Sequence, residues 1–274
     1  MSETGFEDEG DSSVQLVRSL QRGLNVIKAF ARGGSSMTVS DIAKRANLSR
    51  ATTRRLLLTL EDYGYVRSEE GRFVLRPAVL ELGSAYFSSQ LPWTSAAPVM
   101  EQLGSAVQEN SLAGVLDGHS VICVARTSHR MATVGVYVGQ RIPAYSSSMG
   151  RVVLADLPPA ALEEYLATAV LAPITPRTLT DRDALRVELE LVREQGWSIV
   201  EDEVEEGLIG IAAPVYGARG EVIAALNISA HGARVSRQRA LDVLLPPLRA
   251  TAAEISLLFG HSQGIVPLSS SVEA

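Results

Sequence analysis

The segment from residue 39 to residue 64 constrains the fold most strongly, because it pairs two short amphipathic stretches across a tight turn. The first stretch predicts a helix that ends near Ala46. Asn47-Leu48 follows, and asparagine tolerates the left-handed backbone that such a turn requires. Ser49 is a favourable N-cap for a second helix over residues 50–63. Two helices joined this closely predict a helix-turn-helix.

The neighbouring segments extend this motif into a larger unit. Upstream, five apolar residues recur at spacings of four, four, three and three, which predicts a helix from about residue 14 to residue 31. Downstream, two β-rich runs at residues 65–67 and 72–75 flank a turn that contains Gly71, which predicts a hairpin. The order helix, helix-turn-helix, hairpin predicts a winged helix-turn-helix domain over residues 14–76. The five apolar residues are Leu16, Leu20, Leu24, Ile27 and Phe30.

Charge is distributed unevenly along the chain. Residues 14–77 carry twelve Arg or Lys against five Asp or Glu, a net charge of +7, although the whole chain carries −6. Residues 78–274 carry a net −8, and the first thirteen residues carry −5. A basic block beside an acidic remainder is typical of a nucleic-acid-binding module fused to another domain. The alternative is chance clustering of surface charge.

The second helix of the motif is the candidate recognition helix, whose N-terminal end would enter the major groove of DNA. Arginine can form two hydrogen bonds with guanine, and hydroxyl side chains can bond bases or phosphate. Arginines on the hairpin and on the first helix are placed for phosphate or minor-groove contacts. For each arginine the alternative is a solvated helix surface. The predicted DNA-contacting residues are Ser49, Arg50, Ala51, Thr52, Arg54 and Arg55 on or beside the recognition helix, Arg22 on the first helix, and Arg67 and Arg72 on the hairpin.

The remaining chain predicts a linker helix at residues 77–91 and a second domain at residues 92–261. The second domain has the element order α–ββ–β–α–ββ–α, which predicts an α+β fold with a mostly antiparallel sheet and flanking helices. A strand is expected at 131–138, a helix break at 91–93, and a kink at Pro246-Pro247 in the last helix. The polar or acidic segments 1–13 and 262–274 lack periodicity and are expected to be disordered tails.

Several classes of protein do not fit the sequence. No stretch approaches the roughly 20 apolar residues of a membrane helix, and the acidic N-terminus is unlike a signal peptide. The single Cys123 suits a reducing cytoplasm. Phosphate-binding-loop, nucleophile-elbow and zinc-protease motifs are missing, and Asp117, His119, Cys123 and His129 lack the spacing of a known metal site. We therefore expect a cytoplasmic protein with no cofactor, no metal and no catalytic residue.

A series of short motifs, in matching order, resembles the IclR-type transcriptional regulators. The resemblance covers about residues 15–260 and implies a GAF-like effector-binding domain, a homodimer or homotetramer, and control of catabolic genes through double-stranded operator DNA. The segments 126–131 and 144–151 are most similar to the branch that regulates protocatechuate and β-ketoadipate metabolism, which implies an aromatic or dicarboxylic acid effector. The motifs are SLQRGLNVI at 19–27, RLLLTL at 55–60, GYV at 64–66, GQRIPAY at 139–145, SMGRVVLA at 148–155, QGW at 195–197 and EEGLIGIAAPV at 205–215.

The same resemblance implies where the effector binds, namely between the sheet and the loop before a short helix. The helix that opens at Ser147 offers free N–H groups that suit a carboxylate, and Asn227 and Ser229 share one face of a strand. The alternative is that Ser147 is only an N-cap and Asn227 a satisfied strand residue. Where some family members carry Asp or Cys, this chain has Val200 and Gly210. The predicted effector-binding residues are Ser147, Ser148, Met149, Leu208, Gly210, Asn227, Ser229, His129 and Arg130.

Two other functions remain as alternatives at this stage. One is an enzyme built on the GAF-like domain, with the N-terminal module used for dimerisation; the missing nucleophile and base argue against it. The other is a protein–protein adaptor, which would bind its partner without DNA and without sensitivity to salt. The acidic run at 201–206 could carry paired catalytic carboxylates, although a solvated turn or an interdomain ion-pair surface suits it better. His129 and Arg130 have a solvated loop as their alternative.

Overall fold

The computed structural model describes residues 17–32, 34, 36–89, 92–129 and 136–261. The chain divides into two compact units, one within residues 1–89 and the other within residues 90–274. Each unit has a hydrophobic core of its own, so each is described by itself.

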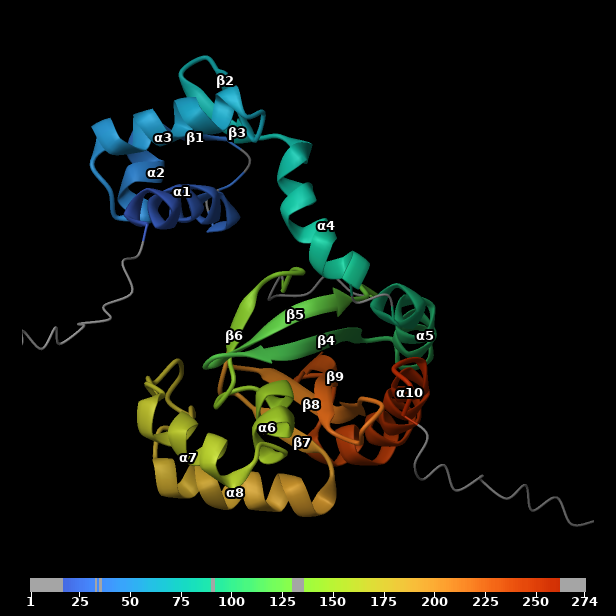
Figure 1. Cartoon of the computed structure of the whole chain (residues 1–274). Helices are drawn as coiled ribbons and strands as arrows, with labels where there is room; N and C mark the ends of the chain where they lie inside the picture. Colours follow the sequence, from blue (N-terminus) through green and yellow to red (C-terminus); the bar gives the residue numbers. More distant parts are fainter. Residues whose placement is uncertain (1–16, 33, 35, 90–91, 130–135, 262–274) are drawn as a thin grey trace, which may run out of the picture. The chain divides into compact units, whose positions relative to one another are not determined.

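The first unit combines helices with a small antiparallel sheet (Figure 1). The predicted winged helix-turn-helix is present, and a two-residue strand that the sequence did not reveal joins the hairpin in the sheet order β1-β3-β2. The elements are α1 (Arg18–Ala29), η1 (Phe30–Arg32), β1 (Met37–Thr38), α2 (Val39–Ala46), α3 (Arg50–Asp62), β2 (Val66–Glu69), β3 (Arg72–Leu75), η2 (Pro77–Val79) and α4 (Leu80–Ser89).

Local hydrogen bonds determine where α2 begins and ends. The Thr38 hydroxyl accepts a bond from the Asp41 N–H at 3.2 Å, and the Asp41 carboxylate accepts one from the Thr38 N–H at 3.1 Å. This capping box satisfies amides that the first turn leaves without partners. The bonds from Thr38 hold the pKa of Asp41 below its ordinary value. At the other end Asn47 adopts φ +53°, the left-handed conformation expected for the turn.

The core of the first unit differs in one respect from the helical periodicity of its first segment. Val26 of α1 and Phe30 of η1 are buried with residues of α2, α3 and the sheet. Leu20 and Leu24, which share the apolar stripe, remain 63% and 43% exposed. Because exposed leucines on one helix face leave apolar surface in water, this stripe is available to a partner.

The second unit contains an antiparallel sheet in the order β6-β5-β4-β9-β8-β7 (Figure 1). The predicted α+β class with an antiparallel sheet is confirmed. The strands are β4 (Asn110–Asp117), β5 (Ser120–Arg126), β6 (Arg141–Pro143), β7 (Ser198–Glu201), β8 (Leu208–Tyr216) and β9 (Val222–His231). The helices are α5 (Pro92–Val107), α6 (Ser148–Ala155), α7 (Pro159–Thr168), α8 (Arg182–Gln195), α9 (Arg237–Arg239), the π-helical η3 (Ala240–Leu244) and α10 (Leu245–Leu258).

Helices cover both faces of this sheet, with α5 and α10 on one side and α6 with α8 on the other (Figure 1). Alternate residues of each strand serve the two sides, as the period of two requires. Ile211 and Ile228 belong to the core under α5 and α10, whereas Ala212 and Ala225 belong to the core under α6 and α8.

Prolines lie at the starts of two helices. The break predicted at residues 91–93 is present, because α4 ends at Ser89 and α5 begins at Pro92, and the fixed φ and missing N–H of proline suit a first helical turn. Pro246 and Pro247 likewise lie in the first turn of α10, and the irregularity precedes them as the π-helical turn η3. The strand expected at 131–138 lies mostly outside the described residues, and residues 136–138 are not a strand.

No helix among the described residues is both long and apolar enough to cross a membrane.

Candidate nucleic-acid interface and ligand cavity

The recognition helix α3 begins at a well-formed cap. The Ser49 hydroxyl accepts a hydrogen bond from the Thr52 N–H at 3.2 Å and donates one to the Thr52 hydroxyl at 2.9 Å. Both side chains therefore fix the start of the helix, where its first N–H groups face outward for an anion. Thr53 and Leu57 are buried and attach the opposite face of α3 to the core.

Arginines of α3 are free to contact another molecule. Arg50, Arg54 and Arg55 are exposed, as is Ala51 between them. Within the part of the chain that the structure describes, none of the three guanidinium groups has a hydrogen-bond or ion-pair partner. Unpaired guanidinium groups on the N-terminal half of a recognition helix suit guanine and phosphate recognition.

The other predicted DNA-contacting arginines lie in three different settings. Arg22, like Arg55, lines a groove between α1 and α3. Arg67 on β2 pairs with Glu69 at 2.8 Å, and both side chains are exposed. Arg72 donates to the hydroxyl and the carbonyl of Ser36 at 2.8 and 2.7 Å, so it anchors the chain before β1. Arg72 thus stabilises the wing itself.

In the second unit, seven of the predicted effector-binding residues surround one cavity between α6 and the sheet. The volume of this cavity is about 70 Å³. The seven are Ser147, Ser148, Met149, Leu208, Gly210, Asn227 and Ser229, and the other lining residues are Leu112, Val136, Gln140, Ile142, Val200, Glu203 and Val204. A mostly apolar lining with a few convergent polar groups is typical of a small-molecule site.

A chain of hydrogen bonds links the polar groups of this cavity. Ser229 donates to the Asn227 side-chain oxygen at 2.7 Å, and the Asn227 amide donates to the Ser148 hydroxyl at 2.8 Å. Gly210 makes room for this contact, because a Cβ there would lie 3.0 Å from the Ser148 hydroxyl oxygen and 3.2 Å from the Asn227 amide nitrogen. A ligand that bonds Ser148 or Ser229 would therefore join an ordered network.

The first turn of α6 provides donors for an anion. The Ser147 hydroxyl accepts from the Gly150 N–H at 3.1 Å, and the Ser147 carbonyl accepts from the Arg151 N–H at 2.9 Å. The amides of Ser148 and Met149 precede these bonds and belong to cavity-lining residues. Amides at this position of a helix attract a carboxylate. Gly150 holds the preceding loop close, since a Cβ would lie 2.0 Å from the Ala144 carbonyl oxygen.

Sequence reasoning missed a buried ion pair beside the cavity. The Arg151 guanidinium, on an almost fully buried residue, donates to both carboxylate oxygens of Glu203 at 2.7 and 2.8 Å and to the Tyr145 carbonyl at 3.0 Å. Glu203 also accepts from the Leu179 N–H at 2.8 Å. The acidic run 201–206 is therefore not simply a solvated turn. Arg151, a lone charge within an apolar helical stretch, was the available signal.

The remaining predicted residues lie elsewhere. His129 packs on α5, where it pairs with Glu101 at 3.2 Å and lies against Gly104, and it does not line the cavity. Arg130 lies outside the described residues. Burial raises the pKa of the Cys123 thiol to about 11, so the thiol stays protonated near neutral pH. Among the described residues, no three His, Cys, Asp or Glu side chains are grouped to hold a metal.

Two family models match the chain. The IclR helix-turn-helix domain matches residues 19–70, and the bacterial transcriptional regulator IclR C-terminal model matches residues 85–257. The chain is 41% identical over 248 residues to the Pca regulon regulatory protein of Pseudomonas putida, covering 89% of this chain and 85% of that protein. It is 34% identical to the p-hydroxybenzoate hydroxylase transcriptional activator of Acinetobacter baylyi strain ADP1, with 87% and 90% covered.

Solved structures agree with these matches. A transcriptional regulator from Rhodococcus sp. RHA1 superimposes with a TM-score of 0.78 at 43% identity, covering 89% of this chain and 98% of that one. An IclR homologue from Microbacterium hydrocarbonoxydans, solved in complex with 4-hydroxybenzoate, gives 0.76 at 29% identity, with 88% and 98% covered. Because both models match and the relatives are regulators, the enzyme alternative is set aside. The chain belongs to the IclR family of bacterial transcriptional regulators.

Proposed function

We propose that this regulator binds operator DNA through α3 and that a small aromatic acid, held in the α6 cavity, changes its operator affinity. The observation that carries the proposal is the cavity itself, which the first residues of α6, Ser148 and Met149, line together with Asn227 and Ser229. A carboxylate at the α6 amides and a ring against Leu112 and Ile142 would satisfy both kinds of lining. The 4-hydroxybenzoate complex of a relative supports this ligand class.

The response to such a ligand requires two conformational states that bind it unequally. A ligand that binds the DNA-competent and the DNA-incompetent state equally well would change nothing, however tightly it binds. The regulator would act in the cytoplasm on genes of aromatic-acid breakdown, a role that the names of the Pseudomonas and Acinetobacter relatives support.

The direct test is a gel-shift titration of the purified protein against the intergenic DNA upstream of its own gene. Protocatechuate, 4-hydroxybenzoate and β-ketoadipate are added separately. We expect specific, salt-sensitive binding that one of the aromatic acids alters. If none of the three compounds alters a specific operator complex, the DNA-binding role stands and the proposed ligand class is rejected. If the chain binds no DNA and instead binds a protein partner with an affinity that salt does not change, the protein–protein adaptor alternative is favoured.

Arg54→Ala should weaken operator binding by more than about 1 kcal/mol, because it removes a donor from the recognition helix. Fluorescence anisotropy on labelled operator measures the change, and the melting temperature checks that the fold is intact. Arg186→Ala is the matched control, since it removes an equal charge from the other unit, where Arg186 pairs with Glu163. Equal operator affinity for wild type and Arg54→Ala would remove Arg54 from the interface.

We also propose that α1 forms a contact between two copies of the chain, so that two recognition helices read a palindromic site. The exposed Leu20 and Leu24 line a groove that extends to Leu60 of α3 and Leu82 of α4. Its lining is largely apolar, which suits the same surface on a second copy better than it suits water.

Leu24→Glu should therefore weaken dimerisation and operator binding together, since it places a charge in an apolar contact. Sedimentation velocity measures the dimer, and anisotropy measures the operator complex. Leu191→Glu is the matched control, because Leu191 of α8 is a similarly exposed leucine that lies in the other unit and belongs neither to the groove nor to α3. A Leu24→Glu protein that stays dimeric at all concentrations would place the contact elsewhere.

A further inference from the structure

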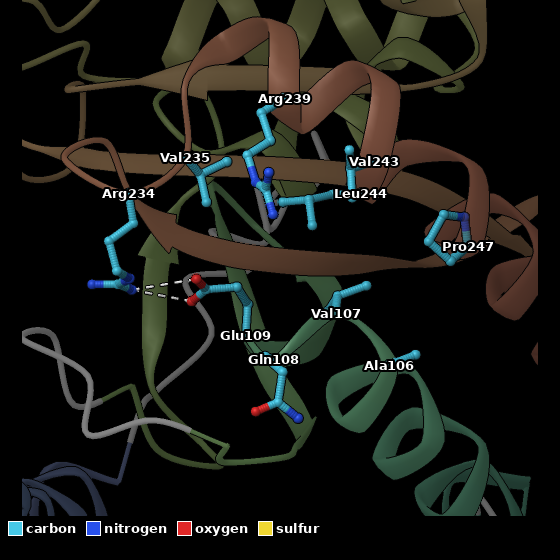
Figure 2. Close-up of a pocket in the computed structure, with 10 residues that line it drawn as sticks. All are labelled: Ala106, Val107, Gln108, Glu109, Arg234, Val235, Arg239, Val243, Leu244 and Pro247. Atoms are coloured by element: carbon cyan, nitrogen blue, oxygen red, sulfur yellow. Dashed lines mark hydrogen bonds and ion pairs between the residues drawn. The ribbon is translucent and has the colours of Figure 1, made fainter.

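A second cavity lies on the other side of the effector domain, under the helices opposite α6. The end of α5, the turn that leads into β4 and residues from the segment 234–247 line it (Figure 2). The volume of this second cavity is about 480 Å³, several times the volume of the α6 cavity. None of the lining residues is shared between the two cavities. It is therefore a separate space.

The base of this second cavity is apolar and one end carries a neutral ion pair. Val235 and Leu244 are buried, and Pro247 lines the wall beside them. At the end, Arg234 donates to both carboxylate oxygens of Glu109 at 3.2 and 3.4 Å (Figure 2). The Glu109 side chain is only 7% exposed. A buried carboxylate needs such a partner, so this pair is already matched in charge.

Arg239 adds one unmatched positive charge. Its side chain extends from α9 toward Leu244 and the cavity (Figure 2). Within the described chain, the guanidinium has no hydrogen-bond or ion-pair partner. The three charged residues at this cavity, Arg234, Glu109 and Arg239, thus carry a net charge of +1. Guanidinium groups bind carboxylates through two parallel hydrogen bonds.

The backbone around the cavity is unusual at two places. Gln108, between α5 and β4, has φ +56°, a conformation that L side chains adopt rarely. Directly after Arg239, residues 240–244 form a π-helical turn. Strained residues and π-helical turns both concentrate at binding sites. Here both occur on walls of one cavity.

From the size, the apolar base and the single unmatched cation, we infer that this cavity binds a small monocarboxylate with an apolar body, its carboxylate on Arg239. A ligand bound in this second cavity would influence the α6 cavity through a short series of contacts. Glu109 directly precedes Asn110, which pairs with Ser229 across β4 and β9, and Ser229 bonds Asn227 beside α6. This coupling, unlike the binding itself, rests on the proposed function of the α6 cavity.

The test is equilibrium dialysis of full-length protein with radiolabelled benzoate, in the wild type and in three variants. Ser148→Leu fills the α6 cavity, Arg239→Gln removes the proposed carboxylate partner, and Arg249→Gln removes an exposed cation of α10 that lines neither cavity. We expect Ser148→Leu to retain one site per chain. Adding Arg239→Gln to it should weaken that site about tenfold or more, whereas adding Arg249→Gln should leave it unchanged.

Three results would overturn the inference. They are loss of all benzoate binding in Ser148→Leu, equal affinity with and without Arg239→Gln, and a change of oligomeric state in Arg239→Gln without any change in benzoate binding. The last would make the surface a contact between copies of the chain. The first of them would leave the α6 cavity as the benzoate site, and none of them would reject the proposed function of that cavity, which the operator titrations measure independently. A crystal grown with 4-bromobenzoate would locate the ligand directly by its bromine.

Discussion

Ser148→Leu is expected to abolish the effector response while the protein still binds its operator. The leucine side chain would occupy most of the small α6 cavity and would remove the hydroxyl that accepts from Asn227. Asn227 would keep its bond to the Ile211 carbonyl at 3.1 Å, so no polar group would lose every partner. Overpacking of this kind destabilises by about 1–3 kcal/mol, which a domain of this size tolerates.

The measurement is operator affinity with and without saturating effector. Ser148→Ala is the control, because it removes the hydroxyl and leaves the space open; it should weaken the effector without eliminating the response. If Ser148→Leu responds to effector as the wild type does, the effector binds elsewhere in the molecule.

Arg151→Met should cause the largest loss of stability, about 3–5 kcal/mol, because it leaves the Glu203 carboxylate buried without its cation. Both tryptophans of the chain, Trp93 and Trp197, lie in the second unit. Urea unfolding followed by tryptophan fluorescence therefore reports this unit alone.

Two further variants separate the ion pair from general effects of charge. Arg186→Met removes an arginine whose pair with Glu163 is exposed, so its loss should stay within about 1 kcal/mol. Arg151→Met combined with Glu203→Gln should recover part of the stability, since the stranded charge is gone. Equal urea midpoints for Arg151→Met and Arg186→Met would mean that the buried pair contributes nothing.

The first unit could be predicted from sequence in most of its detail because its signals are local. The cap at Ser49, the turn at Asn47 and the apolar spacing of α3 lie within a few residues of one another, so pattern and structure agree. The two-residue β1 was missed because only its pairing with β3 makes it a strand. The exposure of Leu20 was missed because helical periodicity identifies an apolar face without identifying what covers it.

The ligand cavity could be predicted only in part, because it is assembled from distant segments. The resemblance to a family located residues on α6, β8 and β9, which the structure brings together around one cavity. The pair of Arg151 and Glu203 spans 52 residues of sequence, and no periodicity links them. His129 was grouped with the cavity residues for its charge, yet it lies in the loop after β5 and packs against α5.

The pairing of β8 with β9 limits how members of this fold can change their ligands. Ile211 pairs with Ile228 and Ala212 with Asn227, so neighbouring residues serve opposite sides of the sheet. Inserting or deleting one residue here would turn Asn227 toward α10 and a core isoleucine toward the ligand. Within these strands, new specificities can therefore evolve by substitution, at positions such as Gly210, whereas changes in length are confined to the connecting loops.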